Sequence, residues 1–383
     1  MKGFLVGCLL LVSALAAAQK APSPGEGVRV VKVGTILPLT GPIYVYGNET
    51  QGAIQMAFED FNQRHLGKGL QVQQISRDDQ FKPDKTIEAF RDLSGDNQIV
   101  ALIGSLTSNC TLAIGSRAQA GRIPLITPTS TNDHIAEAGN YVFQACYRDG
   151  FQGSVAASFA IGRLGARKAV VLTDPDNDYS TGLSQSFTAS FQGAGRAVTT
   201  VSYFTKQTDF ATLAQKVKSL DPDVVFFTDY YEPVGKMVQA LREAGVQSAF
   251  VGSDAWDDVV SHNLETAEGA YYVNHYSTEL PGPENQQFVR AYKNRWGKLP
   301  DALAALGYDA ARILLDAIDR ASVKGEVSRE AIRNELEATN AAYSTGHIRF
   351  TSGHQTWKTA VMLQIVKSGA ELRAQYIGVV EPD

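Results

Sequence analysis

Short apolar runs alternate along most of this chain with longer segments in which apolar residues recur every three or four positions. The short runs are typical of buried strands, and the longer segments are typical of helices that pack on one face. The predicted strands are 30–37, 70–75, 99–104, 123–126, 168–173, 198–203, 223–228, 248–251 and 269–273. The predicted helices between them are 46–64, 82–94, 107–121, 152–164, 180–193, 210–220 and 234–245. This alternation predicts parallel sheets with helices on both faces.

The pattern changes in the last third of the chain. Three successive helices, 284–296, 300–321 and 329–339, precede the antiparallel strands 345–350, 360–367 and 375–380. The earlier strands and helices divide into two similar halves, each expected to form one lobe. Because the three late helices need a sheet to cover, we expect the chain to return to the first lobe and then to cross back to the second. The prediction is an α/β fold with two similar, doubly wound parallel-sheet lobes, joined by a three-segment hinge around a cleft. The expected lobes are 30–146 with 277–349, and 147–276 with 350–383.

The first eighteen residues have the features of an export signal. Lys2 supplies a positive start, residues 4–15 an apolar segment, and 16–18 three alanines at which cleavage is expected. The apolar segment is too short to span a bilayer. Cys8 comes too early for a lipoprotein cleavage site, so no lipidation is expected there. Residues 19–29 resemble a flexible leader, and the mature chain is expected in the periplasm or another extracytoplasmic space.

Length and charge narrow the class of protein. The 383 residues exceed the usual size of one hydrophobic core, which favours two domains. The formal net charge of −5, without a basic stripe, argues against a nucleic-acid partner. The mature chain keeps two cysteines, Cys110 and Cys146. In an exported protein they are compatible with one disulfide or with two buried thiols, and the sequence leaves both open.

Two hydroxyl-rich segments carry the clearest functional signal. Residues 104–109 (Gly-Ser-Leu-Thr-Ser-Asn) and 126–132 (Ile-Thr-Pro-Thr-Ser-Thr-Asn) each follow a predicted buried strand. The carboxyl end of a parallel strand, where a helix begins, offers free N–H groups and a favourable helix dipole to an anion. Neither segment has a general base beside it or a phosphate-loop pattern. The sequence therefore predicts binding of an anionic group rather than catalysis.

Other chemistry is not indicated. The chain has no Gly-x-Ser-x-Gly, His-Glu-x-x-His or Gly-x-x-x-x-Gly-Lys motif. We therefore expect that the protein is not an enzyme and that it binds no cofactor. The histidines show no metal-ligand spacing, and His65, His134, His262 and His354 are predicted to lie on the surface. The acidic pair Asp78-Asp79, which follows the predicted strand 70–75, could on its own indicate a metal site or a catalytic pair of carboxylates.

Short motifs follow one another in a fixed order along nearly the whole mature chain. They are 33–42 (Val-Gly-Thr-Ile-Leu-Pro-Leu-Thr-Gly-Pro), Tyr46-Gly47, Asp78-Asp79, Ile103-Gly104 with Ser108, Pro128 with Thr131-Asn132, Tyr179 with Gly182, 227–231, Gly252-Ser253-Asp254 and 307–310. In this order and spacing the chain resembles the extracytoplasmic solute-binding proteins of ABC transporters, specifically the leucine/isoleucine/valine-binding group with the type I periplasmic-binding fold.

The resemblance implies a set of ligand contacts. Ser108 and Thr131 correspond to the groups that hold the ligand carboxylate, and Asp254 to the acidic residue that pairs with its ammonium. Many leucine-type binders carry Glu where this chain has Asp254, which leaves the exact ligand open. The remaining candidates are the aromatic residues Tyr46, Tyr179 and Tyr230, the residues Leu106 and Thr107 at the side-chain end, and Trp256, which matches no ligand position of the family.

Taken without the resemblance, these residues have ordinary structural interpretations. Ser108 and Thr131 are also suited to helix caps or turns, and Asp254 to a surface loop. With it, the acidic pair Asp78-Asp79 is interpreted as structural, capping or rimming the cleft. The resemblance also implies that the chain is the binding component of an ABC importer for amino acids, above all for branched-chain ones. The chain would act as a monomer that presents its ligand to membrane permease subunits. The alternative is a sensor domain for amides, small carboxylates or other amino acids.

Overall fold

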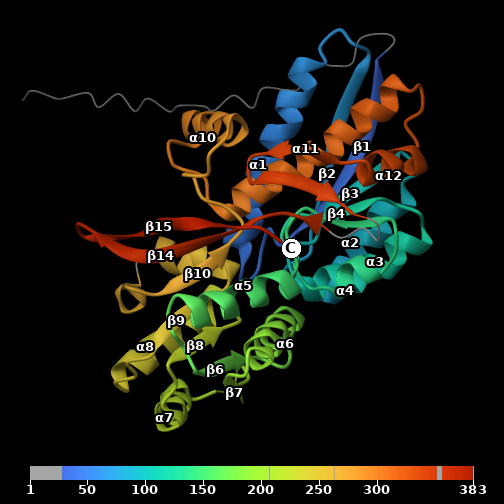
Figure 1. The fold of residues 1–383 in the computed structure, drawn as a ribbon. Coiled ribbons are helices and arrows are strands. Elements are labelled where there is room, and N and C mark those ends of the chain that lie inside the picture. The colour runs from blue at the N-terminus through green and yellow to red at the C-terminus, as the bar shows by residue number, and fades with distance from the viewer. Residues whose placement is uncertain (1–27, 207, 263, 352–355, 383) are drawn as a thin grey trace, which may run out of the picture.

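The computed structural model describes residues 28–382 except 207, 263 and 352–355. The predicted export signal, Cys8 and His354 lie outside the described residues. Two sheets form two lobes, with the first lobe in the upper part of Figure 1 and the second below it. Among the residues that the structure describes, no helix has the length and apolar character needed to cross a bilayer.

The first lobe is built on a five-stranded parallel sheet. Its order is β2 (Leu70–Asp78), β1 (Arg29–Leu37), β3 (Ile99–Gly104), β4 (Leu125–Thr127) and β5 (Val142–Gln144). The helices α2 (Pro83–Gly95) and α3 (Ser108–Ala120) pack on one face of it. The other face carries α1 (Tyr44–Arg64), α11 (Ala302–Val323) and α12 (Arg329–Glu337). Successive strand residues point to opposite faces, so Val33 and Ile36 belong to different cores.

The second lobe has a seven-stranded mixed sheet. Its order is β15 (Glu371–Val380), β14 (Ala360–Ser368), β10 (Tyr271–Asn274), β9 (Ala249–Gly252), β8 (Val224–Phe227), β6 (Lys168–Thr173) and β7 (Ala197–Ser202). The strands from β10 to β7 are parallel, and β14 is antiparallel to both of its neighbours. Helices α5 (Asp149–Gly162) and α6 (Asp178–Gly193) cover one face, and α7 (Phe210–Leu220) and α8 (Tyr231–Glu243) the other.

The structure confirms the predicted fold class, and the three late helices do return to the first lobe. The helix α10 (Pro283–Trp296) lies against α1, where the Tyr292 hydroxyl donates to Glu49 Oε2 at 2.8 Å. The predicted antiparallel strands are one place where the structure differs from the prediction. The predicted strand 345–350 is β12 (Gly346–Phe350), which pairs with two unexpected strands in a separate small sheet. Those partners, β11 (Asn340–Tyr343) and β13 (Thr356–Trp357), are too short to show a period in the sequence.

The chain passes between the two sheets three times, after β5, after β10 and after β13. Side chains of the third crossing hold the other two. The buried Lys358 ammonium donates to the carbonyl oxygens of His275 at 3.0 Å and Thr345 at 2.6 Å. The Thr356 hydroxyl donates to the carbonyl oxygen of Gln144. The three crossings therefore lie side by side and are bonded to one another.

Two predictions about single residues are settled by the fold. Cys110 and Cys146 are free, buried thiols, so no disulfide joins them here, and burial raises the pKa of Cys110 to about 11. His65, predicted to be exposed, is buried: its ring stacks on Phe61 and its Nε2 lies 3.0 Å from Asp319 Oδ1. His65 directly follows the last residue of α1 as its C-cap. The sequence does not reveal its burial, because the polar groups of an imidazole can bond locally while the ring packs.

Candidate functional site

The two sheets direct the carboxyl ends of their parallel strands toward a common cavity between the lobes. The cavity measures about 540 Å³, counting the space at its open mouth. Loops that follow β3, β4, β8, β9 and β10 contribute to its wall, together with the first turns of α1, α6 and α11. This is the place where open α/β sheets bind ligands, and it is where the sequence analysis put the site.

The first-lobe wall begins where β3 turns sharply into α3. Gly104 has φ 126°, and a Cβ there would lie 2.1 Å from the Ile36 carbonyl oxygen, so the turn requires glycine. The Ser105 hydroxyl donates to buried Asp79, while its carbonyl oxygen accepts a hydrogen bond from Thr127 Oγ1. These bonds fix the loop, and they confirm the structural interpretation of Asp79.

Asp78 is also structural. Its Oδ1 accepts the backbone N–H of Leu39 at 2.9 Å and that of Gln80 at 2.9 Å, and its Oδ2 accepts the Thr40 hydroxyl at 2.5 Å. These donors hold the loop between β1 and α1 beside the cleft. The oxygen atoms of the acidic pair are therefore occupied by groups of neighbouring loops, which is a structural role.

The hydroxyl groups at the start of α3 remain available. Thr107 precedes the helix and Ser108 is its first residue, and both line the cavity. Thr107 Oγ1 is buried without a hydrogen-bond partner among the described residues, and Ser108 Oγ accepts only a long bond, 3.3 Å, from the Asn132 backbone N–H. The N–H groups of the first turn have no intrahelical acceptor. Together they suit a negatively charged group.

Thr131 lies behind this wall. It is fully buried, and its hydroxyl oxygen has no hydrogen-bond partner within the part of the chain that the structure describes. It is not among the side chains that line the cavity, whereas Thr129 is, and Thr129 Oγ1 donates to the Leu106 carbonyl oxygen at 2.7 Å. The second hydroxyl-rich segment therefore reaches the cavity through Thr129 as well as holding the first segment in place.

Asp254 forms the opposite, second-lobe wall. It follows β9 at the start of a short 3₁₀ turn, and three donors surround its carboxylate. Tyr179 Oη donates to Oδ1 at 2.5 Å and Gln152 Nε2 donates to the same oxygen at 2.8 Å, while His275 Nε2 lies 3.3 Å from Oδ2. Burial alone would raise the pKa of Asp254, but the hydrogen bonds that its carboxylate accepts from His275, Tyr179 and Gln152 bring it below its usual value.

The three tyrosines that the resemblance singled out line the cavity. Tyr179 and Tyr230 stack with their ring centroids 5.2 Å apart. Tyr46, from the first lobe, meets the Tyr230 ring edge-on at 6.3 Å. Burial raises the pKa of the Tyr179 and Tyr230 phenols, which therefore stay neutral and able to donate. The Tyr46–Tyr230 contact joins the two lobes, so the structure holds them closed over the site.

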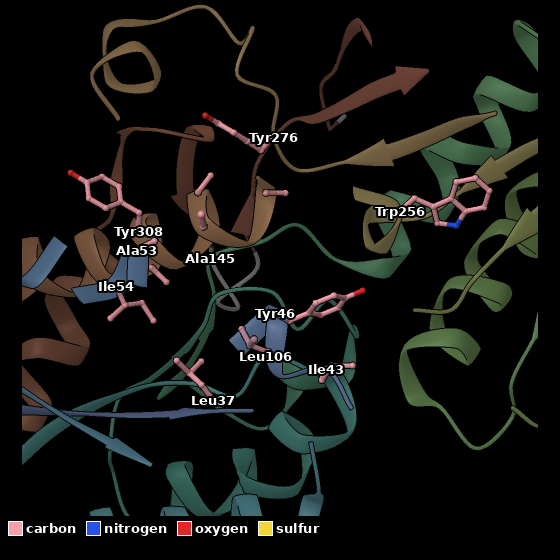
Figure 2. Close-up of a cluster of buried hydrophobic side chains, with 14 of the residues drawn as sticks. Leu37, Ile43, Tyr46, Ala53, Ile54, Leu106, Ala145, Trp256, Tyr276 and Tyr308 are labelled. Carbon is pink, nitrogen blue, oxygen red and sulfur yellow. The ribbon is translucent and has the colours of Figure 1, made fainter. Parts of the chain in front are cut away.

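The remaining wall is apolar. Leu106 from the first hydroxyl-rich segment faces Ala302, Leu303 and Leu306 in the first two turns of α11. Figure 2 shows Leu106 close to Tyr46, with both on the first-lobe side of the cluster. Asp257 also lines the cavity beside this wall, and its Oδ2 accepts the Ala302 backbone N–H at 3.0 Å. One part of the cavity thus offers charge-compatible groups, and another offers mostly hydrocarbon.

Trp256 does not line the cavity, contrary to the expectation. Its side chain is fully buried and packs against Phe227, with ring centroids 5.2 Å apart. In Figure 2 its indole lies on the second-lobe side and points away from Tyr46. A Cβ at Gly252 would lie 2.2 Å from this indole, so Trp256 supports the back of the strand that carries Asp254.

Sequence reasoning missed Gln152 and His275. His275 comes directly after β10, so the rule that strand ends meet in the cleft could have found it. Gln152 stands in the first turn of α5, 102 residues from the carboxylate to which it donates, and no local pattern points to it. Both side chains matter because they set the surroundings of Asp254.

Comparison with known proteins agrees with this architecture. The profile of the family described as periplasmic binding protein matches residues 30–370. The chain belongs to the periplasmic binding protein family. It is 26% identical over 320 residues to Leu/Ile/Val-binding protein homolog 3 of Brucella melitensis, covering 82% of this chain and 85% of that one.

Solved structures share the fold. A leucine-binding protein of Thermotoga maritima superposes with a TM-score of 0.84 at 31% identity, over 92% of this chain and 99% of that one. The branched-chain amino acid transporter substrate-binding protein of Streptococcus pneumoniae, in complex with isoleucine, has a TM-score of 0.81 at 26% identity. That match covers 92% of this chain and 100% of the other. The type I periplasmic-binding fold predicted from the sequence is confirmed.

Proposed function

We propose that this chain is the extracytoplasmic substrate-binding component of an ABC importer, and that its ligand is an amino acid of the leucine, isoleucine or valine type. Membership of the periplasmic binding protein family supports the receptor role. The relatives named for leucine, isoleucine and valine support the ligand class. Export to the periplasm, a monomeric state and permease subunits as membrane partners belong to the same proposal.

The observation that carries the ligand class is the distribution of charge across the cavity. The α3 N-terminus, with Thr107 and Ser108, favours a carboxylate on the first-lobe side. On the second-lobe side, the ionised Asp254 favours an ammonium group. A zwitterionic α-amino acid satisfies both walls at once, and no single-charge ligand does.

The apolar wall selects the side chain. Leu106, Leu303 and Leu306 can remove a branched aliphatic group from water without offering it a hydrogen bond. Burial of such a group contributes about 0.8 kcal/mol for each CH2. A charged or strongly polar side chain would lose its hydration there, so the wall disfavours it.

The experiment is a thermal-shift and calorimetric comparison of three ligands on ligand-stripped mature protein. Leucine carries both charged groups, 4-methylpentanoate lacks the ammonium, and 3-methylbutylamine lacks the carboxylate. We expect strong binding of leucine alone, with a gain of about 2.7 kcal/mol in unfolding free energy at 100 times Kd. For a chain of this size that gain is a shift of a few degrees.

Variants assign the two ends of the ligand. Asp254→Asn should weaken leucine at least about tenfold, because it removes the charge that pairs with the ammonium. Asp84→Asn, at an exposed position in α2, is the matched control and should leave affinity unchanged. Binding of 4-methylpentanoate as tight as leucine would reject the amino-acid class but keep the receptor. Failure of leucine, isoleucine and valine to bind at all would reject the proposed ligand.

A further inference from the structure

His275 lies where the hinge meets the cavity. It follows β10 directly, lines the cavity, and its ring is almost entirely buried, with 1% of the side chain exposed. Its Nε2 lies 3.3 Å from Asp254 Oδ2. The other carboxylate oxygen, Oδ1, accepts hydrogen bonds from Tyr179 and Gln152. Among the residues that the structure describes, His275 is the donor that reaches Oδ2.

Three contacts hold the imidazole in this position. Its face stacks on Tyr147, with ring centroids 3.5 Å apart and planes 27° apart. Its backbone N–H donates to Asn274 Oδ1 at 2.7 Å. Its carbonyl oxygen accepts a bond from the buried ammonium of Lys358, which belongs to the third crossing. Packing against Tyr147 therefore holds the ring, and the bonds to Asn274 and Lys358 hold the backbone of His275.

The proton arrangement follows from the partners. With Asp254 ionised, only Nε2–H can donate to Oδ2, which leaves Nδ1 as an acceptor without a partner among the described residues. The charged groups that face the ring are the Asp254 carboxylate and the Lys358 ammonium, and the phenol of Tyr147 covers its face. Burial lowers the pKa of His275, and this effect outweighs the opposing effect of the Asp254 carboxylate. The neutral ring is therefore favoured.

A neutral donor matters for what the carboxylate can bind. A protonated His275 would cancel the charge of Asp254 and place a second cation beside the ligand ammonium. The neutral ring orients the same carboxylate while leaving its negative charge to the ligand. We propose that His275 is a positioning residue that orients Asp254 and keeps its negative charge for a ligand ammonium, so that it sets the preference for amino acids over simple carboxylates. This proposal rests on the function proposed above.

The test compares two substitutions by competition calorimetry with leucine and 4-methylpentanoate. His275→Leu fills similar space without a donor, and we expect about a tenfold or greater loss of leucine affinity at pH 7.5. The affinity for 4-methylpentanoate, which has no ammonium, should change less than about threefold. His275→Gln can still donate an amide N–H and should keep leucine affinity within a few-fold of wild type.

The pH profile separates positioning from simple packing. As pH falls from 7.5 to 5.0, protonation of His275 competes with the ligand ammonium, so wild-type leucine affinity should decline. His275→Gln has no titrating ring and should lack this decline. His347→Gln, at an exposed position of β12, is the matched control and should follow the wild type.

Each outcome has one meaning. Equal loss of both ligands in folded His275→Leu would reduce His275 to packing and overturn the proposal. So would a wild-type leucine affinity in that variant, or the same acid-side decline in His275→Gln. If wild-type protein binds no amino acid, the proposed function itself has failed. If wild-type protein binds leucine and the variants do not discriminate, only the role of His275 has failed.

Discussion

At the scale of single residues, Asp229 shows how burial sets a charge beside the cleft. It directly precedes Tyr230, and only 2% of its surface is exposed. Its Oδ1 accepts bonds from Asn177 Nδ2 and the Tyr230 N–H, and its Oδ2 accepts the Tyr203 hydroxyl at 2.7 Å. Burial, supported by the neighbouring Asp174 charge, outweighs these bonds and raises the pKa of Asp229 to about 6.

This raised pKa predicts a pH dependence of stability. An unfolded aspartate has a pKa near about 4, so between pH 4 and 6 the native protein holds the extra proton. Its contribution is fully present below pH 4 and is lost as pH rises through 6. Relative to Asp229→Asn, wild-type unfolding free energy should fall by up to about 2–3 kcal/mol between pH 4 and 6.5. Urea unfolding of both proteins at four pH values checks this, and parallel pH curves would contradict it.

The same scale shows which site residues a sequence can reveal. Ser108 was predicted because it follows a recognisable strand and strand ends meet in the cleft, whereas Asp254 was predicted from the resemblance to the leucine/isoleucine/valine-binding group. Trp256 was misplaced because two residues of spacing do not tell which side of a 3₁₀ turn faces the ligand. Gln152 was missed because its bond to Asp254 joins distant segments, and such a bond exists only after folding.

At the scale of elements, long helices were predicted to within a few residues because an apolar stripe repeats over several turns. The helix 210–220, for example, is α7 without any change of bounds. The apolar pattern of each helix does not predict how closely two helices pack against each other. Gly307 of α11 faces α1, and a Cβ there would lie 2.7 Å from Thr50 Cγ2 and 2.9 Å from the Thr50 carbonyl oxygen.

Gly307→Ala should therefore force α1 and α11 apart. We expect a loss of about 1–3 kcal/mol in unfolding free energy, because overpacking at rigid backbone outweighs the better helix propensity of alanine. Gly162→Ala, at the last residue of α5 with no atom within 4 Å of the new Cβ, is the control and should be neutral or slightly stabilising. Denaturant unfolding measures both, and equal stability of the two variants would refute the helix-contact argument.

At the scale of the whole molecule, the lobes and crossings followed from the alternation of strands and helices, but the closed arrangement did not. Contacts between lobes involve single side chains that no periodicity marks. Asn109, beside Ser108 in the first lobe, illustrates this. Its Oδ1 accepts the backbone N–H of Asp178 at 3.1 Å, and its Nδ2 donates to the Asp176 carbonyl oxygen at 3.4 Å, both in the second lobe.

Asn109→Ala should weaken closure without removing any group that lines the cavity. The 3.1 Å hydrogen bond contributes about 0.5–1.5 kcal/mol and the long 3.4 Å bond adds little, so leucine affinity should fall roughly threefold to tenfold. The loss should lie mainly in faster dissociation, because the closed state opens more readily while ligand entry into the open cleft is unchanged. Stopped-flow kinetics tests this, with Asn334→Ala on the exposed face of α12 as control. An unchanged dissociation rate would mean that the other contacts between the lobes, such as the tyrosine pair Tyr46–Tyr230 and the bond from Asn132 Nδ2 to the Asp178 carbonyl oxygen at 2.8 Å, hold them together.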